Sequence, residues 1–189
     1  MLLKGVRQGQ IPARTQAARD WYRDKARKQR SASAYPSNIL SDMDKSKRVL
    51  IGRMYHFRYD PKGAKTLPYY DKFPLIFMVG PAAGGFYGIN LHYLPPQLRA
   101  KLMDSLYSIT NNTKYDASTK LKISYDVLNS ASKYKYFKPT FKHYLSSQVK
   151  SEFIEINSTE WDTALFLPTE RFEKARKSKV FADSRRMLK

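Results

Sequence analysis

The clearest pattern in the chain is an alternation of aromatic and other side chains over residues 54–59. Tyr55, Phe57 and Tyr59 occupy every second position, with Met, His and Arg between them. Successive side chains of a strand point to opposite faces of a sheet, so this period predicts a strand with one buried face and one face in water. We expect the three rings to pack in the core against the strands that follow.

Two further strands are predicted directly after this one. Residues 73–79 form a continuous apolar run, which is typical of a central strand. The four glycines between positions 80 and 88 predict a hairpin turn into a third strand over residues 86–93. A glycine-rich loop can hold a phosphate when it opens a helix, but here a strand pattern follows and no Gly-Lys-Ser or Gly-Lys-Thr is present, which favours the turn.

The second half of the chain shows helical patterns. Leu98, Leu102 and Leu106 form an apolar stripe after two prolines that favour a helical first turn. The order of strands, then a helical insertion, then strands again predicts an α+β body. It would consist of a small curled antiparallel sheet, which could close into an SH3-like barrel, with inserted helices. The remaining expected elements are helices from Asp116 and from Pro139 through Leu145, a strand at Phe153–Ile156, a strand or extended run at Ala164–Pro168 and a basic helix capped by Thr169.

The chain divides into a body and two basic helical extensions. We expect residues 1–48 to form an arm with one amphipathic helix, from Thr15 to Arg30, followed by a linker of turn-forming residues. Residues 49–168 form the α+β body, and residues 169–189 form a basic helical tail.

Positive charge is concentrated at the two ends. Residues 1–30 contain nine Lys or Arg against two Asp, and residues 171–189 contain eight against two acidic residues, in a chain with a formal net charge of +19. Basic ends on a nearly balanced body predict contact with nucleic acid or an acidic partner; the alternative is an ordinary docked helix whose charges face water. The candidate contact residues are Arg14, Arg19, Arg23, Arg27 and Arg30 at the first end and Arg176, Lys177, Lys179, Arg185 and Arg186 at the second.

Cations also alternate with aromatic side chains inside the body. Lys133, Lys135 and Lys138 lie between aromatic residues, a composition that lets a groove follow phosphates while rings stack on bases. The equally weighted alternative is that these rings are core residues with lysines in water between them. The candidates for stacking are Tyr134 and Tyr136 in this segment and Tyr69 in the loop after the first strand. For that loop the alternative is that Leu67, Pro68 and Tyr70 pin it to the body.

Residue types exclude several function classes. The chain has no cysteine, which excludes disulfides, thiolate metal sites and cysteine nucleophiles. No apolar run reaches the roughly 20 residues of a membrane span, so we expect no membrane partner. His56, His92 and His143 are scattered without metal-ligand spacing, and we expect no catalytic residues, no metal, no cofactor and no small-molecule substrate.

A metal-dependent nuclease would need clustered carboxylates around a divalent ion. The acidic residues of the body are mostly isolated, and no pair precedes a lysine at nuclease-like spacing, so a small nuclease is the third hypothesis only. The acidic residues considered are Asp60, Asp71, Asp104, Asp116, Asp126, Glu152, Glu155 and Glu160.

Four segments carry a resemblance that spans nearly the whole chain. Residues 14–22, 67–76, 88–96 and 181–187 are similar to a family of basic proteins from T-even-like contractile-tailed phages, including marine phages. The resemblance implies a viral protein made in a bacterial cytoplasm, with virion structure or viral DNA handling as the leading roles. It implies context and no particular site residues.

Together these observations favour a non-enzymatic phage protein. The first hypothesis is a structural or assembly component, such as a tail or neck component, whose basic arms contact other virion subunits or DNA. The alternative is an accessory DNA-binding factor that acts in DNA-end binding, packaging or recombination. We expect it in the host cytoplasm during assembly and then on the virion.

Overall fold

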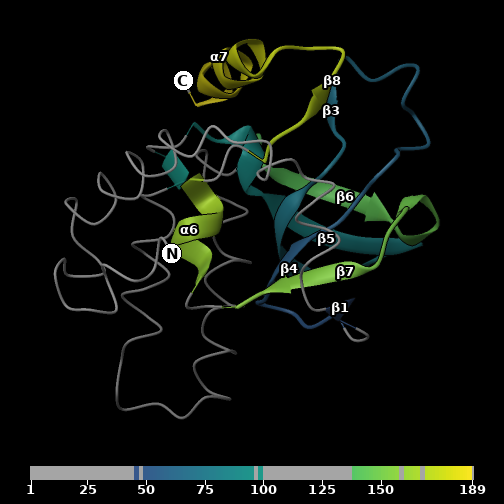
Figure 1. Cartoon of the computed structure of the whole chain (residues 1–189). Helices are drawn as coiled ribbons and strands as arrows, with labels where there is room; N and C mark the ends of the chain where they lie inside the picture. The colour runs from purple at the N-terminus through teal and green to yellow at the C-terminus, as the bar shows by residue number, and fades with distance from the viewer. Residues whose placement is uncertain are drawn as a thin grey trace, which may run out of the picture.

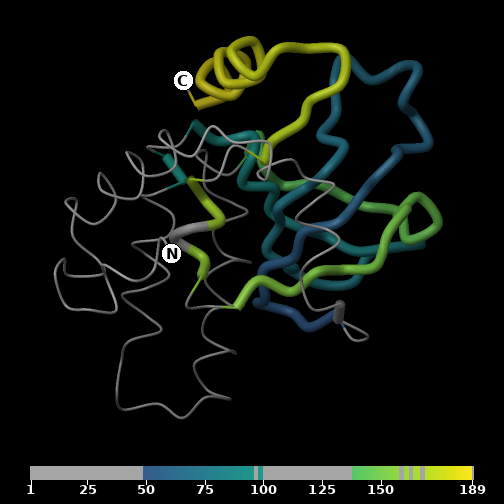
Figure 2. The backbone as a smooth tube through the Cα atoms, viewed as in Figure 1, coloured from purple at the N-terminus to yellow at the C-terminus, as the bar shows by residue number. Residues whose placement is uncertain are grey.

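The computed structural model describes residues 45–46, 49–95, 98–99, 138–157, 160–166 and 169–188. Figure 1 shows an antiparallel sheet with a short helix beside it and a longer C-terminal helix at the top, which confirms the expected α+β class, and Figure 2 shows the course of the chain. The expected helices at Thr15–Arg30 and from Asp116 lie outside the described residues. The described elements are β1 (Lys45–Ser46), β2 (Met54–His56), β3 (Tyr70–Asp71), β4 (Leu75–Ala82), β5 (Gly85–Asn90), the 3-10 helix η2 (Leu91–Tyr93), β6 (Phe141–Leu145), the 3-10 helix η4 (Ser146–Gln148), β7 (Phe153–Ile156), α6 (Trp161–Phe166), β8 (Phe172–Glu173) and α7 (Lys177–Met187).

The sheet is open. Six antiparallel strands follow the order β1-β7-β2-β4-β5-β6, and β3 pairs with β8 in a separate two-stranded sheet. The SH3-like barrel is not formed, because β1 and β6 are opposite edges of the sheet and do not pair with each other. At the centre, Tyr55 of β2 stands between Ile76 of β4 and Glu155 of β7.

The predicted hairpin joins β4 and β5. Gly84 has a φ of +69°, a conformation that glycine adopts without steric penalty. A Cβ atom on Gly85 would lie 1.8 Å from the carbonyl oxygen of Tyr144 in β6, so only glycine allows this close approach of the two strands. The segment is therefore a turn, as its sequence predicts.

Both faces of β2 are buried, which corrects the expected water-facing side of the first strand. Tyr55, Phe57 and Tyr59 pack against β4 and β5 as expected, and Met54 and His56 between them are only 0% and 2% exposed. We call the first face the aromatic core; it comprises Tyr55, Phe57, Tyr59, Ile76, Met78, Phe86 and Tyr144. The helix-side core on the other face comprises Met54, Leu75, Phe77, Val79, Ile89, Leu91, Leu94, Ile154, Ile156, Trp161 and Leu165.

Two segments adopt the opposite secondary structure from the one predicted. Residues 141–145 form strand β6 instead of a helix from Pro139, because they pair with β5 along its whole length. Residues 164–166 end helix α6 instead of forming an extended run, since Trp161 and Leu165 lie one turn apart and both enter the helix-side core. In both cases tertiary packing decides between the two conformations.

The C-terminal helix begins later than predicted. Thr169 does not cap it, because Phe172 and Glu173 first pair with Asp71 and Tyr70 of β3, and α7 starts only at Lys177. The structure thus confirms a basic C-terminal helix and ties its start to the body. Within the described ranges, no helix has the length and apolar character to cross a membrane.

Candidate nucleic-acid interface

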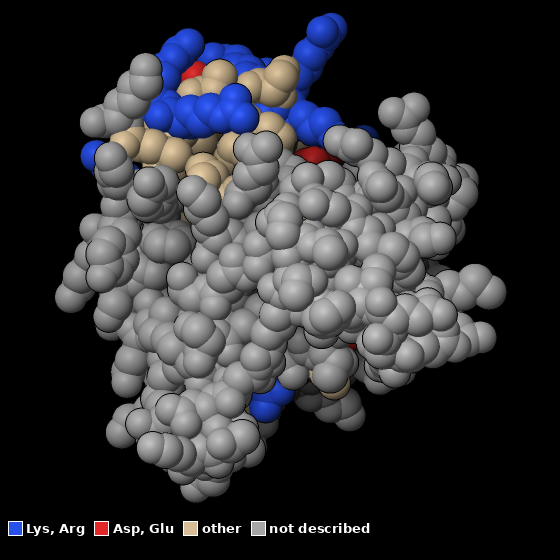
Figure 3. All heavy atoms as spheres, turned by 90° about the vertical axis from the view of Figure 1, so that its left-hand side faces the viewer, with Lys and Arg blue, Asp and Glu red and all other residues tan. Residues whose placement is uncertain are grey.

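Helix α7 presents a basic face to water. Its buried residues are Val180 and Ser184, which lie one turn apart on its inner side. Lys177, Lys179 and Arg186 expose 60%, 62% and 79% of their side chains, and Arg176 and Arg185 are also exposed. Figure 3 shows these Lys and Arg side chains gathered at the top of the molecule, where α7 lies in Figure 1.

Ion pairs within the protein neutralise only part of this charge. Asp183 contacts Lys179 and Arg186, each at 3.3 Å, and Glu170 lies 3.5 Å from Lys177. In the part of the chain that the structure describes, no carboxylate lies within ion-pair distance of Arg176 or Arg185. Exposed ion pairs contribute about 0–1 kcal/mol, so phosphates can displace them readily.

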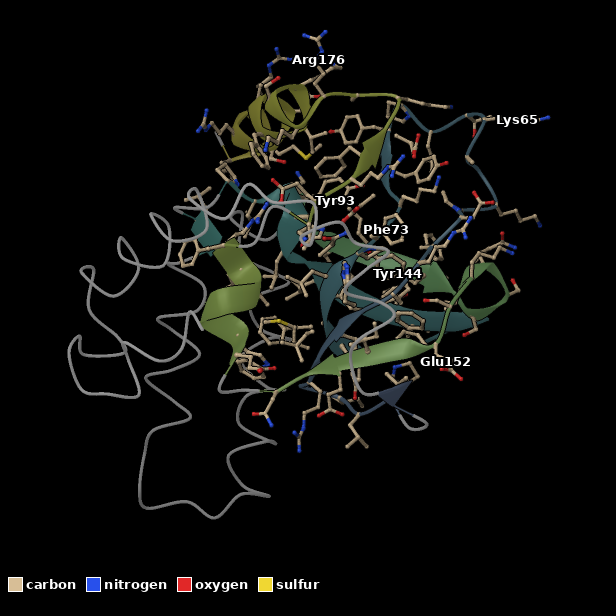
Figure 4. All side chains as sticks on the ribbon, in the orientation of Figure 1. Lys65, Phe73, Tyr93, Tyr144, Glu152 and Arg176 are labelled. Atoms are coloured by element: carbon tan, nitrogen blue, oxygen red, sulfur yellow. The ribbon has the colours of Figure 1, made fainter. Side chains whose placement is uncertain are left out.

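The first turn of α7 adds to the positive potential. Arg176 occupies the N-cap position without a side-chain cap hydrogen bond, and the first turn contains no acidic residue. The backbone N–H groups at a helix start carry a partial positive charge, which cations beside it oppose by about 0.3–1 kcal/mol each. The charges at this end of α7 therefore favour the binding of an anion, and they lower the stability of the helix. Figure 4 shows Arg176 on the outer side of α7.

The segment before α7 is fixed to the body at several points. β8 pairs with β3, and the Nζ of Lys174 donates hydrogen bonds to the carbonyl oxygens of Lys65 and Leu67, at 2.8 and 3.1 Å. The ring of Tyr69 lies 6.3 Å from that of Phe172, and burial together with the nearby carboxylate of Asp183 in α7 raises the pKa of Tyr69. These contacts connect the long loop, β8 and the helix.

A buried polar network lies beneath this segment. Nδ1 of His92 donates to a carboxylate oxygen of Asp71 at 2.7 Å, and Nε2 of His92 lies 3.0 Å from the hydroxyl of Thr169. The side-chain amide of Asn90 donates to Asp71 and to the Tyr144 hydroxyl, both at 3.1 Å. The network joins β3, the β5–η2 junction, β6 and the start of the C-terminal segment.

The pKa values of Asp71 and His56 in this region are shifted. Burial alone raises the pKa of Asp71, but the adjacent His92, the Asn90 amide and the Phe73 N–H outweigh burial and lower it. Burial lowers the pKa of His56 to about 4, and its ring lies 6.1 Å from that of His92. Asp71 is therefore charged and His56 neutral at neutral pH.

Asp71, His92 and Thr169 have the hydrogen-bond order of a catalytic triad. Their exposures are 3%, 0% and 4%, so no substrate reaches the Thr169 hydroxyl in this structure. The arrangement can fix the C-terminal segment to the sheet. Asp71 accepts hydrogen bonds from four residues, namely the backbone N–H groups of Phe73 and Arg171, the side-chain amide of Asn90 and the ring of His92.

Arg99 is a second buried anchor of the same region. It is 1% exposed and donates to the carbonyl oxygens of Leu94, Leu165 and His92, at 2.7, 3.0 and 3.2 Å. Glu170 lies 3.7 Å from it and supplies the opposite charge. Arg99 thus links η2, α6 and the segment leading to β8.

The structure brings together only part of the predicted site. Arg176, Lys177, Lys179, Arg185 and Arg186 lie on one exposed helix, and Lys138 is exposed in the turn before β6. Tyr69 is half-buried, with its ring 6.1 Å from that of Tyr93. The candidates outside the described residues are Arg14, Arg19, Arg23, Arg27, Arg30, Lys133, Lys135, Tyr134 and Tyr136.

Sequence patterns alone do not predict the polar network or the buried position of Arg99. His92 lies 21 residues from Asp71 and 77 residues from Thr169, and no local spacing predicts that the three meet. Among the described residues no group of three or more His, Asp or Glu could hold a metal ion. Glu155, one of the carboxylates considered for a nuclease, forms an ion pair with Arg53 at 3.1 Å.

Comparison with known proteins gives one match. The family model described as phage T4 terminal DNA protecting protein matches residues 11–187, which includes all of the described strands and helices. No curated protein and no solved structure is significantly similar to the chain.

Proposed function

Because this chain belongs to the family of the phage T4 terminal DNA protecting protein, we propose that it binds the ends of phage DNA and shields them as a non-enzymatic protein. This is the DNA-end-binding alternative of the sequence analysis, and the family favours it over a tail or neck component. The supporting structural observation is the outward basic face of α7, held to the body by β8 and the buried polar network.

The α7 face suits phosphate binding. Lys and Arg side chains that neutralise phosphates release counterions, and this contribution does not depend on base sequence. Four cations on the three turns of α7, with Arg176 at its N-cap beside the positive helix end, provide such a surface. We therefore expect weak sequence preference and strong salt dependence.

The N-terminal arm contributes to the same binding in this proposal. Its nine basic residues within positions 1–30 carry more charge than α7 alone. Deleting residues 1–30 should reduce the slope of log K against log salt by several units, at about 0.9 per lost phosphate contact. An unchanged slope would assign the arm to a protein partner.

A protective role needs no bond cleavage. Occupying a DNA end excludes an exonuclease from the same site, and binding energy alone suffices. The buried Asp71, His92 and Thr169 have no access to DNA in this structure, and they serve to position the C-terminal segment.

End protection is the direct test. Linear duplex DNA with and without the full-length protein is exposed to an exonuclease that degrades from duplex ends, and surviving DNA is measured over time. We expect protection by the wild type and weaker protection by the triple variant Arg176→Gln, Arg185→Gln, Arg186→Gln. Lys62→Gln, which removes an exposed lysine from the β2–β3 loop, is the matched control and should protect as the wild type does.

Three outcomes oppose the proposal in different ways. Equal affinity for circular and linear DNA would remove the end-specific role. Protection that requires another virion protein would support the assembly role instead. Loss of DNA in the presence of Mg²⁺ and the protein alone, abolished by Asp60→Ala or Glu155→Ala, would support the nuclease hypothesis.

A further inference from the structure

Two exposed rings and the half-buried ring of Phe141 form an aromatic surface on the two outermost strands at one side of the sheet. Tyr87 of β5 is 36% exposed, and its ring is stacked on Phe141 of β6, with centroids 5.1 Å apart and planes at 20°. The ring of His143, also on β6, lies 5.4 Å from Tyr87 at 49°. His143 is exposed, and its Nε2 lies 3.0 Å from the carbonyl oxygen of Ala83 in the hairpin turn. We call Tyr87, Phe141 and His143 the aromatic platform.

The platform lies on the helix-side face, beyond the part that α6 covers. Ile89, two residues along the same strand and on the same face, is fully buried in the helix-side core with Trp161 and Leu165. Figure 1 places α6 toward the other end of the sheet from the β4–β5 hairpin, and Tyr87 lies two residues from the start of β5 at that hairpin. Exposure therefore rises along β5 from Ile89, which is fully buried, to Tyr87, which is 36% exposed.

The cross-strand partners of Tyr87 are small or polar. Across β4 its partner is Gly80, which has no side chain, and across β6 its partner is His143. We would expect a larger apolar patch for a protein partner. The three rings, with the polar atoms of the phenol and the imidazole at their edges, match one flat heterocycle that also has polar edges.

Charge near the platform favours a nucleic acid. Lys138 is exposed three residues before Phe141, and in the sequence it ends the segment in which lysines alternate with aromatic residues. Aromatic side chains on a sheet surface bind bases by stacking, and nearby cations follow the sugar–phosphate backbone.

We propose that the aromatic platform stacks on an unpaired base at the end of a DNA strand. The inference rests on the proposed function and adds which part of the DNA is recognised. An unpaired terminal base has a free face on which a ring can stack, whereas a base inside a duplex does not. The cations of α7 and of the arm hold the phosphates, and the platform distinguishes an end from continuous duplex.

The test uses two synthetic DNAs and the full-length protein. One is a duplex with a short single-stranded tail whose terminal base is 2-aminopurine, and the other is a dumbbell of the same duplex closed by hairpins. Wild type should quench the 2-aminopurine fluorescence and bind the tailed DNA more tightly than the dumbbell. Tyr87→Ala should weaken tailed-DNA binding about 5- to 150-fold, leave dumbbell binding unchanged and abolish the quenching.

Two variants serve as controls for this test. Tyr87→Phe keeps the ring and should behave as wild type. Leu67→Ala truncates a side chain that is 38% exposed, close to the value for Tyr87, on the distant β2–β3 loop and should have no effect on either DNA. Thermal unfolding shows whether the Tyr87→Ala protein is folded. If it is not, His143→Ala, at an exposed site, replaces it and should also weaken binding of the tailed DNA.

The outcomes separate this inference from the proposed function. If the wild type protects linear DNA but neither quenches 2-aminopurine nor prefers the tailed DNA, the role of the aromatic platform alone is overturned. Equal binding of the tailed DNA by wild type and a folded Tyr87→Ala protein does the same. Wild type that binds neither DNA overturns the proposed function as well.

Discussion

The imidazole of His92 lies 2.7 Å from a carboxylate oxygen of Asp71, and the two side chains are 0% and 1% exposed. The same imidazole reaches the hydroxyl of Thr169 with its other nitrogen. Asp71 also accepts hydrogen bonds from the backbone N–H groups of Phe73 and Arg171, at 3.2 and 3.4 Å. One buried carboxylate thus ties the segment before the basic helix to the sheet, so the position of surface charge depends on an internal network.

Asp71→Asn should destabilise the fold strongly. The amide cannot accept at both positions, which leaves buried N–H groups unpaired. Removing one partner of a buried charged network costs about 3–5 kcal/mol. Urea unfolding at neutral pH measures this loss. Asp60→Asn changes an exposed carboxylate and should leave the free energy of unfolding within about 0.5 kcal/mol of wild type. Equal stability of the two variants would contradict a structural role for the Asp71 network.

Histidine protonation should destabilise the protein in mild acid. The pKa of His56 is about 4 in the folded state and near 6.5 in the unfolded chain, so protons bind the unfolded state more tightly. The stability from neutral His56 is complete above about pH 6.5 and is lost as pH falls toward 4, by about 3 kcal/mol in total.

Urea unfolding at pH 7, 5.5 and 4.5 tests the His56 contribution. Asp71 has a lowered pKa and loses its contribution only as pH falls below its ordinary value of 3.8, so the two windows are separate. His56→Gln should flatten the decline between pH 6.5 and 4.5. The same decline in wild type and variant would assign the acid sensitivity to other groups.

Local signals in the sequence account for part of the fold. The alternation of Tyr55, Phe57 and Tyr59 predicts a strand where β2 lies, although β2 ends at His56 and both of its faces are buried. The glycines of the hairpin predict its turn correctly, because a turn depends on near neighbours in sequence. The helix predicted from Pro139 is wrong, since the pairing of Tyr144 with Phe86 across the sheet overrides a local start signal.

The candidate site is predictable only where charge alone defines it. The cations of α7 are visible in the sequence, but the start of that helix depends on the pairing of Phe172 with Asp71, about one hundred residues away. The aromatic platform likewise combines Tyr87 with Phe141 and His143, which no sequence spacing connects. Contacts of this kind become visible only in the folded chain.

Phe57→Ala should remove the centre of the aromatic core. Phe57 is 0% exposed, and its ring centroid lies 4.8 Å from that of Phe153 and 5.5 Å from that of Tyr144. Truncating a buried phenylalanine costs about 3–5 kcal/mol, because the cavity closes only in part. Urea unfolding should show this loss, while the exposed Lys138→Ala should change stability very little. A loss below about 1 kcal/mol for Phe57→Ala would contradict the packing described for this face.

Arg176→Ser should stabilise the protein and weaken DNA binding at the same time. Arg176 holds the N-cap position of α7 with no side-chain cap, and its carbonyl oxygen accepts from the N–H of Lys179 at 3.0 Å. A serine hydroxyl there can accept from a free N–H of the first turn, which contributes about 0.5–2 kcal/mol. The change also removes a cation beside the positive helix end.

The matched variant Arg176→Gln separates the two effects. It removes the same charge without supplying a good cap, so its stability should rise less than that of Arg176→Ser. Both variants should lower the slope of log K against log salt by about 0.9, the value for one phosphate contact. Thermal unfolding and a salt titration of DNA binding provide the two measurements. Unchanged slopes in both variants would place the DNA away from the start of α7, because a cation that contacts phosphate must release a counterion when it binds.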